Sequence, residues 1–165
     1  MDYFESFPVT YYRFSNSDDY ILLKHILRRF RFREKVKDIV GWWDNYIIMD
    51  HETPESIAQS VYGDPKLHWI ILLFNDIIDP FSDFPLNSDQ LNKYVDEKYP
   101  DARNSIHHYT KGGRIVPQGT SGATAVSNYQ FEFLVNEAKR KIRLPKSDYI
   151  RPILVEFEKI LKEEA

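Results

Sequence analysis

The 165-residue chain has no cysteine and no long apolar run. Without cysteine, disulfides, thiolate metal ligands and a cysteine nucleophile are excluded, and a reducing compartment is expected. The longest unbroken apolar run, Trp69 to Phe74, is far shorter than the roughly 20 residues that span a bilayer. Residues Met1 to Glu5 lack the basic and apolar stretches of a secretory signal. The sequence therefore predicts a soluble protein that no classical route secretes and that has no membrane partner.

Motifs of the common enzyme classes are absent as well. His51-Glu52 is not followed by a second histidine three residues later, so the zinc-protease pattern is missing. No Gly-Lys-Ser/Thr phosphate loop occurs, and Gly119 to Ala123 lacks the glycine spacing of a nucleophile elbow. The pair His107-His108 has no third ligand at a defined spacing, which favours surface histidines over a metal site. We therefore expect no catalytic residues, no cofactor and no metal.

Aromatic residues, in contrast, are abundant. The chain has 11 Tyr, 11 Phe and 3 Trp, and 42% of its residues are hydrophobic. Such a chain can bury enough apolar area to offset the conformational entropy that is lost on folding. At this length, one compact domain with peripheral arms is expected.

The formal net charge of −3 hides an uneven distribution. Between Lys24 and Lys37, seven Lys or Arg stand against Glu34, with Asp38 directly after. Between Asp76 and Asp101, seven Asp or Glu stand against two lysines. The basic stretch carries no recognisable DNA- or RNA-reading motif. We therefore interpret it as a charged surface or a charged protein contact, and expect no nucleic-acid partner.

The N-terminal part of the chain predicts an arm. Apolar residues between Phe7 and Phe14 follow a proline and precede a Ser-Asn-Ser-Asp turn signal, which indicates a short edge strand or an extended arm. Between Tyr20 and Val40, apolar residues recur at spacings that suggest a helix in two pieces.

The middle of the chain has clearer boundaries. A short apolar run from Tyr46 to Met49 is typical of a strand. Thr53-Pro54 then predicts a helix start, with a capping hydroxyl before proline, and Tyr62-Gly63 predicts the end of that helix. Asp64-Pro65 repeats the start signal ahead of an apolar segment that ends at Asn75. We expect this second helix to lie in the core.

The C-terminal half predicts a mixture of loop, strand and helix. An amphipathic helix is expected near Asp89 to Tyr99, and Pro100 to Asn128 looks irregular. Alternating apolar residues from Tyr129 to Val135, a turn, and Arg140 to Leu144 together predict a β-hairpin. Apolar residues at helical spacing in the tail predict a terminal helix that begins or kinks about Pro152.

The stretch from Tyr46 to Pro80 resembles a LysM module. The pattern of that family is strand, helix, helix, strand, in which a threonine caps the first helix and an asparagine closes the second. The positions that match its structural core are Thr53, Ile57, Ala58, Tyr62, Gly63, Trp69, Leu73 and Asn75. The sequence departs from the pattern after this point, because the second strand is reduced to Asp83 to Leu86. That departure argues against sugar binding.

A longer resemblance connects the chain to the LysM-like baseplate wedge subunits of T-even-type contractile-tailed bacteriophages. It is carried by Thr53 to Ala58, Tyr62 to Pro65, His68 to Ile77, Asp83 to Leu86, Glu97 to Tyr99 and Asn136 to Ile142. The resemblance implies a structural subunit of the tail baseplate that joins neighbouring wedges and clamps wedge core proteins. It also implies several copies in a sixfold ring, other wedge and tail proteins as partners, and a location in the virion after assembly in the host cytoplasm.

These elements together predict an α+β fold. We expect a small LysM-like strand-helix-helix core with an N-terminal arm, a C-terminal β-hairpin and a terminal helix. The corresponding segments are an N-terminal arm and helical segment (1–45), the LysM-like core with the following helix (46–99), and an extended loop, β-hairpin and C-terminal helix (100–165).

Six residues are candidates for contacts with partner proteins. Trp42 and Trp43 are adjacent, so on a strand or helix both cannot face one interior, and one is free to reach a partner. The basic stretch and the irregular segment 100–128 are the other candidate interfaces. Their candidate arginines are Arg29, Arg31, Arg33 and Arg114.

The alternative function is a cell-wall module that recognises N-acetylglucosamine polymers such as peptidoglycan. It is supported by the LysM-like core alone. The module is not repeated and no enzyme domain accompanies it, so we expect negligible binding of the isolated protein to peptidoglycan or chitin.

Overall fold

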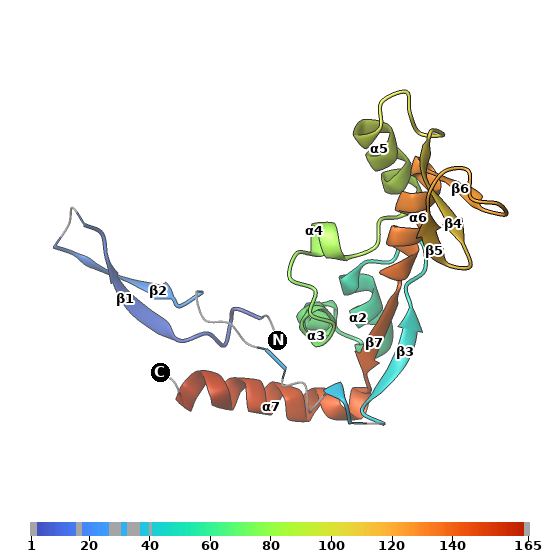
Figure 1. The fold of residues 1–165 in the computed structure, drawn as a ribbon. Helices are drawn as coiled ribbons and strands as arrows, with labels where there is room; N and C mark the ends of the chain where they lie inside the picture. Colours follow the sequence, from blue (N-terminus) through green and yellow to red (C-terminus); the bar gives the residue numbers. More distant parts are fainter. Residues whose placement is uncertain (1–2, 16–17, 27–30, 33–36, 40, 164–165) are drawn as a thin grey trace. The chain divides into compact units, whose positions relative to one another are not determined.

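The computed structural model describes residues 3–15, 18–26, 31–32, 37–39 and 41–163, and it has the expected α+β fold (Figure 1). The chain divides into two compact units. Unit 1 comprises Met1–Asn45, Thr53–Ile78 and Arg143–Ala165, and unit 2 comprises Tyr46–Glu52 and Asp79–Ile142. Unit 1 therefore takes residues from all three consecutive segments expected from the sequence, and unit 2 takes residues from two of them.

Unit 1 contains an antiparallel hairpin of β1 (Val9–Arg13) and β2 (Tyr20–Lys24). For Phe7 to Phe14 the sequence predicted either a short edge strand or an extended arm, and β1 is a strand. The helix expected from Tyr20 is wrong at its start, because this segment pairs with β1 along its whole length. The polar Ser-Asn-Ser-Asp sequence between the strands is typical of a hairpin connection. Much of the remaining segment up to Val40 lies outside the described residues.

The middle of unit 1 consists of two helices joined by a 3-10 turn, with bounds α2 (Pro54–Tyr62), η1 (Pro65–Leu67) and α3 (His68–Phe74). Both predicted helix starts are confirmed. The Thr53 hydroxyl accepts a hydrogen bond from the Ser56 N–H, and the Ser56 hydroxyl accepts one from the Thr53 N–H. The Asp64 carboxylate caps η1 by accepting from the Lys66 N–H.

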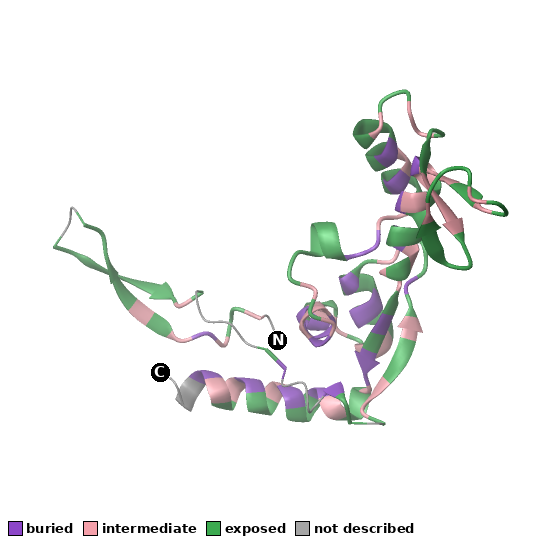
Figure 2. Ribbon diagram, in the orientation of Figure 1, coloured by how far each residue is buried: buried purple, intermediate pink, exposed green. Residues whose placement is uncertain are grey.

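The core of unit 1 includes α3 and the C-terminal helix α7 (Ser147–Glu163). One side of α7 is buried, as Figure 2 shows, at Ile150, Ile153, Phe157 and Leu161. The Phe157 ring lies 4.7 Å from the Trp69 ring and 6.2 Å from the Phe7 ring. The terminal helix is confirmed, although it begins at Ser147 and contains Pro152 in its interior.

A two-stranded sheet pairs β3 (Trp43–Ile47) with β7 (Lys141–Pro145). The pairing is antiparallel, since the Lys146 N–H donates to the Trp42 carbonyl and the Ile48 N–H donates to the Arg140 carbonyl. The boundary between the two units falls inside both strands. Along the chain, β3 is thus followed by α2 and α3, and its pairing strand comes only after residues 79–140.

Unit 2 combines three helices with a three-stranded antiparallel sheet in the order β5-β4-β6. The bounds of these elements are α4 (Pro80–Asp83), α5 (Ser88–Lys98), β4 (Ile106–Lys111), β5 (Arg114–Val116), β6 (Thr124–Ser127) and α6 (Asn128–Ala138). Helix α5 confirms the amphipathic helix predicted near Asp89 to Tyr99. It packs against α6, which also contacts β4 and β6.

The irregular loop predicted over Pro100 to Asn128 is wrong, because this segment contains all three strands of the sheet. Gly112 and Gly113 have φ values of 57° and 76° and connect β4 to β5. Two consecutive residues with positive φ form the tight turn whose twist matches that of antiparallel strands. The double glycine was therefore a hairpin signal.

The β-hairpin predicted over Tyr129 to Leu144 is also wrong. Its first half is α6, and its second half is β7, which pairs with β3. Ser127 caps α6 and forms a capping box with Gln130. This local pattern, at the start of the segment, favours a helix over a strand. The alternation of apolar residues imitates a strand, but the buried positions of α6 are four residues apart.

Candidate protein-interaction surfaces

The two adjacent tryptophans are both half-buried and lie against other side chains of unit 1. Trp42 stacks on Tyr149, with ring centroids 4.6 Å apart and an interplanar angle of 12°. The Trp43 Nε1–H donates to the Lys37 carbonyl at 2.8 Å, and the Arg143 guanidinium lies 4.6 Å from the Trp43 ring centroid. Each indole is thus held by its own chain on one side. Contact with a partner through the remaining surface stays a prediction.

The four candidate arginines are spread over the two units. Arg31 is exposed in unit 1, with its Nε 3.7 Å from a carboxylate oxygen of Asp76. Arg114 is exposed at the start of β5 in unit 2, opposite Lys111 in the β4–β5 register. Arg29 and Arg33 lie outside the described residues. An interface role of these arginines stays a prediction.

The LysM-like positions lie in unit 1, on and around α2 and α3. Thr53 is the exposed cap of α2, and Gly63 ends α2 in a left-handed conformation with a φ of 75°. Ile57 and Ala58 are fully buried. On α3, Trp69 is buried and Leu73 is half-buried, and the completely buried residues are its neighbours Ile70 and Ile71.

Tyr62 and Asn75 connect these two helices to β7. The Tyr62 hydroxyl donates to the Pro145 carbonyl at 2.9 Å, and burial raises the pKa of this phenol well above its usual range, so it remains a neutral donor. The Asn75 Nδ2 donates to the carbonyls of Ile71 and Arg143, and its Oδ1 accepts from the Arg143 N–H at 2.8 Å. Both side chains therefore serve the packing of unit 1.

Helix α6 of unit 2 reverses the usual amphipathic pattern. Its buried residues are polar, namely Asn128, Glu132 and Asn136. Three consecutive residues on its outer side are apolar and exposed, at 41% for Phe133, 60% for Leu134 and 41% for Val135. A helix normally buries its apolar side chains and exposes the polar ones. The outer side of α6 is therefore a candidate contact surface for another protein.

The buried polar side of α6 is satisfied by hydrogen bonds. Glu132 accepts from the Lys98 ammonium at 2.9 Å and from the Tyr99 hydroxyl at 2.8 Å. Burial alone would raise the pKa of Glu132, but these two hydrogen bonds hold the pKa below its usual range. Asn128 donates to the Ala102 carbonyl at 2.8 Å. Polar contacts thus help to fix α6 in unit 2, while Phe133, Leu134 and Val135 stay exposed.

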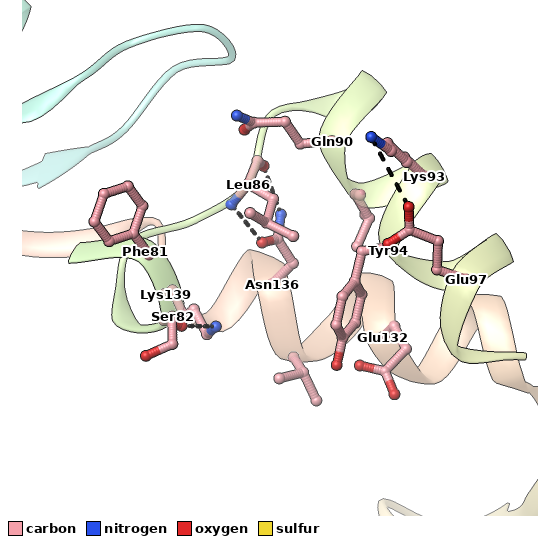
Figure 3. Close-up of a pocket in the computed structure, with 12 residues that line it drawn as sticks. Phe81, Ser82, Leu86, Gln90, Lys93, Tyr94, Glu97, Glu132, Asn136 and Lys139 are labelled. Carbon is pink, nitrogen blue, oxygen red and sulfur yellow. Dashed lines mark hydrogen bonds and ion pairs between the residues drawn. The ribbon is translucent and has the colours of Figure 1, made fainter. Parts of the chain in front are cut away.

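A groove of about 400 Å³ lies between α4, α5 and α6 in unit 2 (Figure 3). Its apolar lining includes Leu86, Leu91, Tyr94 and Val135, and it is bordered by Phe81, which is 92% exposed. Its polar border includes the ion pair of Lys93 and Glu97, and Lys139, whose ammonium donates to the Ser82 carbonyl. An apolar hollow with polar edges is typical of a pocket that receives one anchoring side chain of a partner.

The β1–β2 hairpin exposes apolar side chains on both of its faces. The strand register places Val9, Tyr11, Tyr20 and Leu22 on one face and Tyr12, Ile21 and Leu23 on the other. Their exposed fractions run from 43% for Leu23 to 72% for Tyr11. An isolated two-stranded hairpin is only marginally stable in water. Both faces of this hairpin are therefore candidate contact surfaces.

The histidine pair makes local contacts. His107 stacks on Phe131 at 4.0 Å, and the Nδ1 atoms of His107 and His108 lie 2.8 Å apart. Within the described ranges, no three His, Cys, Asp or Glu side chains come together in a way that could hold a metal ion. In the same ranges, no helix has both the length and the apolar character needed to cross a bilayer.

The α6 surface, the groove and the two-sided hairpin were not among the sites predicted from sequence. The α6 surface was missed because its residues were assigned to a strand. The capping box of Ser127 and Gln130 was the signal that would have revealed it. The hairpin was missed because Tyr20 to Lys24 was assigned to a helix. That both faces of the hairpin are apolar becomes visible only when the pairing of the two strands is known.

Comparison with known proteins agrees with the longer of the two resemblances. The model of the family described as base plate wedge protein 53 matches residues 12–114, more than half of the chain. The chain is also 26% identical over 175 residues to the baseplate wedge protein gp53 of Enterobacteria phage T4, and the match covers 91% of this chain and 83% of the relative. Neither match addresses the LysM-like character of the core. The chain therefore belongs to the base plate wedge protein 53 family.

Proposed function

We propose that this chain is a non-catalytic structural subunit of a contractile-tail baseplate that joins neighbouring wedges and clamps wedge core proteins. The observation that carries the proposal is the family match over residues 12–114. The related wedge protein, which covers 91% of the chain, supports it. The subunit resides in the virion tail baseplate and assembles in the host cytoplasm. Its partners are other wedge and tail proteins, with several copies in a sixfold ring.

The exposed apolar surfaces support a joining role. A subunit that links two neighbours needs separate contact surfaces, and large exposed apolar areas usually mark such contacts. Unit 1 exposes both faces of the β1–β2 hairpin, and unit 2 exposes the outer side of α6 beside the groove. Each unit thus offers one surface of this kind.

The predicted tryptophan and arginine contacts are assigned to the clamping role. Tryptophan and arginine are enriched among the residues that dominate protein interfaces. Trp42 and Trp43 each keep an accessible portion, and Arg114 is exposed on β5. These residues are therefore the first positions to change in a clamping experiment.

Co-expression with the neighbouring tail proteins tests the proposal. The full chain, carrying an affinity tag, is purified together with whatever it binds, and the product is examined by electron microscopy. We expect wedge or baseplate particles, and weaker recovery of partners with Arg114→Glu. The matched control is Arg151→Glu, which reverses an exposed charge on α7. A chain that purifies alone under all conditions would contradict the structural role, and equal recovery with both variants would remove Arg114 from the interface.

Glycan binding is the second candidate function. The chain order of β3, α2, α3 and then the pairing strand β7 resembles the strand-helix-helix-strand pattern of LysM modules, with residues 79–140 inserted before the last strand. Cosedimentation of the purified protein with peptidoglycan is the direct measurement. We expect negligible binding. Clear, saturable sedimentation with the cell wall, together with failure to capture wedge proteins, would replace the structural proposal.

A further inference from the structure

We propose that the outer edge of β3 binds an extended strand of another baseplate protein. The added strand continues the β3–β7 sheet through main-chain hydrogen bonds and makes β3 its middle strand. The inference rests on the proposed function, because it names the kind of segment through which a wedge partner is held. Three observations carry it: the backbone groups on this edge, the absence of devices that protect an edge strand, and exposed apolar side chains beside it.

The register of β3 and β7 shows which backbone groups face outward. The Lys146 N–H donates to the Trp42 carbonyl and the Ile48 N–H donates to the Arg140 carbonyl, so these residues lie opposite one another in pairs. In an antiparallel pair, hydrogen-bonded residues alternate with residues whose backbone groups point away from the partner strand. The even-numbered residues of β3 therefore bond to β7. The residues whose N–H and C=O point to the other side are Trp43, Asn45 and Ile47.

These outward groups have no partner in the part of the chain that the structure describes. There, β3 pairs with β7 alone, and no hydrogen bond joins the backbone N–H or C=O of Trp43, Asn45 or Ile47 to another group. Three donors and three acceptors thus repeat every two residues, or about 7 Å, along the edge. The ligand that matches such a row is the backbone of another extended strand.

The edge of β3 lacks the usual protection. Edge strands commonly carry proline, lysine or a bulge, which discourage pairing with a further strand. The five residues of β3 include neither proline nor lysine. The hydrogen bonds at the two ends of the sheet enclose five residues on each strand, 43–47 and 141–145, so β3 has no bulge. Its one charged side chain, Asp44, lies 3.7 Å from the Lys146 ammonium. A partner strand can therefore reach the edge.

Exposed apolar side chains lie beside the edge. Ile47, at the end of β3, is 65% exposed, and Met49, which follows it, is 64% exposed. Trp43, one of the contact residues predicted from the sequence, is on the same side of the strand as Ile47. Side chains of an added strand would lie next to Ile47 and cover it, as cross-strand neighbours do. The partner segment should therefore carry apolar side chains at alternate positions.

The occupant is assigned to another protein and not to a second copy of this chain. Pairing of two β3 edges would join identical surfaces and would stop at a dimer in which both edges are used. A subunit that clamps wedge proteins needs this edge for them. The segment it binds is therefore an extended stretch of a wedge or tail protein.

The experiment changes the edge without changing the β3–β7 pairing. Asn45→Pro removes an outward N–H and places a ring on the edge, a position that proline tolerates in edge strands. Asn45→Lys puts a charge there that opposes strand addition, and it decides the test if the proline variant does not fold. The full tagged chain is co-expressed with the neighbouring tail proteins, and captured partners are quantified by mass spectrometry. We expect about tenfold lower recovery with either variant.

Ala125→Pro is the matched control on a different edge strand. The Gly112–Gly113 turn makes Lys111 and Arg114 a hydrogen-bonded pair, so the backbone groups of Tyr109 are also directed to β5. Ala125 lies opposite Tyr109 on β6, and its own N–H therefore points outward. This variant should recover partners like the unaltered chain. Circular dichroism should show that the variants compared are folded.

Amide hydrogen exchange reads the edge directly. In the free chain, the amides of Asn45 and Ile47 should exchange faster than those of Asp44 and Tyr46, which bond to β7. In the captured complex, the two outward amides should become protected. A change in stability alone would not produce this alternation.

Four outcomes decide against the inference. Recovery with the Asn45 variants equal to that of the control, or protection of the outward amides in the free chain, overturns it and leaves the proposed function standing. Protection that appears only as the isolated chain is concentrated assigns the edge to a second copy, and this overturns the assignment to another protein. If the unaltered chain captures no partner at all, the inference and the proposed function both fail.

Discussion

Asn136 makes a pair of hydrogen bonds with the backbone of Leu86. The Asn136 Oδ1 accepts from the Leu86 N–H at 2.7 Å, and its Nδ2 donates to the Leu86 carbonyl at 2.9 Å. The side-chain amide thus acts as one residue of a neighbouring strand would act toward Leu86. Because Asn136 is 3% exposed, both hydrogen bonds are shielded from water. They hold the segment between α4 and α5 against α6, next to the groove.

Replacement of this amide should destabilise unit 2. Asn136→Ala leaves the Leu86 N–H without its partner and leaves the Leu86 carbonyl with only a long hydrogen bond from Arg140, at 3.5 Å. We expect a loss of about 1–3 kcal/mol in the free energy of unfolding. Urea unfolding followed by circular dichroism measures the loss. Asn104→Ala, at an exposed position of the same unit, is the control and should change stability by less than about 0.5 kcal/mol. A loss as small as that of the control would show that water replaces the Asn136 amide.

Glu132 should make the stability of unit 2 sensitive to acid. Hydrogen bonds from Lys98 and Tyr99 outweigh the effect of burial and keep the pKa of Glu132 below its ordinary value. A carboxyl group with a lowered pKa in the folded state stabilises the fold above its unfolded pKa of about 4.3. That stabilisation is lost as the pH falls through the folded pKa.

The urea midpoint, measured from pH 7 to pH 3, tests this prediction. The unaltered chain should lose more stability over the acid part of this range than Glu132→Gln, which cannot titrate. Asn104→Ala, at an exposed residue whose side chain does not titrate, should keep the slope of the unaltered chain. Parallel curves for the unaltered chain and Glu132→Gln would mean that Glu132 contributes no acid sensitivity.

The β4–β5 turn should tolerate only residues that adopt positive φ. Gly112 has a φ of 57°, and a Cβ atom at this position would meet no other atom within 4 Å, so the constraint is conformational and not steric crowding by neighbours. We expect Gly112→Val to cost roughly 1–2 kcal/mol and Gly112→Asn to cost much less, because asparagine enters the left-handed region more readily. Amide hydrogen exchange of β4 and β5 reports the difference. Equal protection in both variants would contradict the turn geometry.

The cap of α2 should be replaceable by serine but not by alanine. Thr53→Ala removes the hydroxyl that accepts from the Ser56 N–H, at an expected cost of about 0.5–2 kcal/mol. Thr53→Ser retains the hydroxyl and should restore most of the stability. Thermal unfolding of the two variants, compared with the unaltered chain, checks this order. A serine variant as unstable as the alanine variant would point to the threonine methyl group instead.

Local signals in the sequence predicted α2, α3 and α5, whereas the short helix α4 was not predicted. The ends of α2 depend on Thr53 and Gly63, and the start of α5 depends on Asn87, which forms a capping box with Gln90. Such caps act within a few residues, so they can be read from the sequence without knowledge of the fold.

Long-range pairing could not be predicted in this way. β3 and β7 are separated by more than 90 residues, and the sequence of neither strand indicates with which strand it pairs. The alternation of apolar residues from Tyr129 to Val135 indicated a strand because such residues were assumed to face a core. In α6 the buried positions are polar, so the rule that relates apolar character to burial fails there. Surfaces that contact other chains are where this rule is expected to fail, because their apolar residues are exposed in the isolated chain.

The side chain of Asn75 has a further consequence for β7. In an antiparallel pair, alternate residues direct their backbone groups to one side, so the N–H and carbonyl of Arg143 point away from β3. Asn75 occupies both of these groups. An open strand edge invites pairing with a strand of another molecule. By closing the outer edge of β7 at its centre, one asparagine protects a chain that is rich in exposed apolar surface from uncontrolled sheet growth, and leaves association to its specific surfaces.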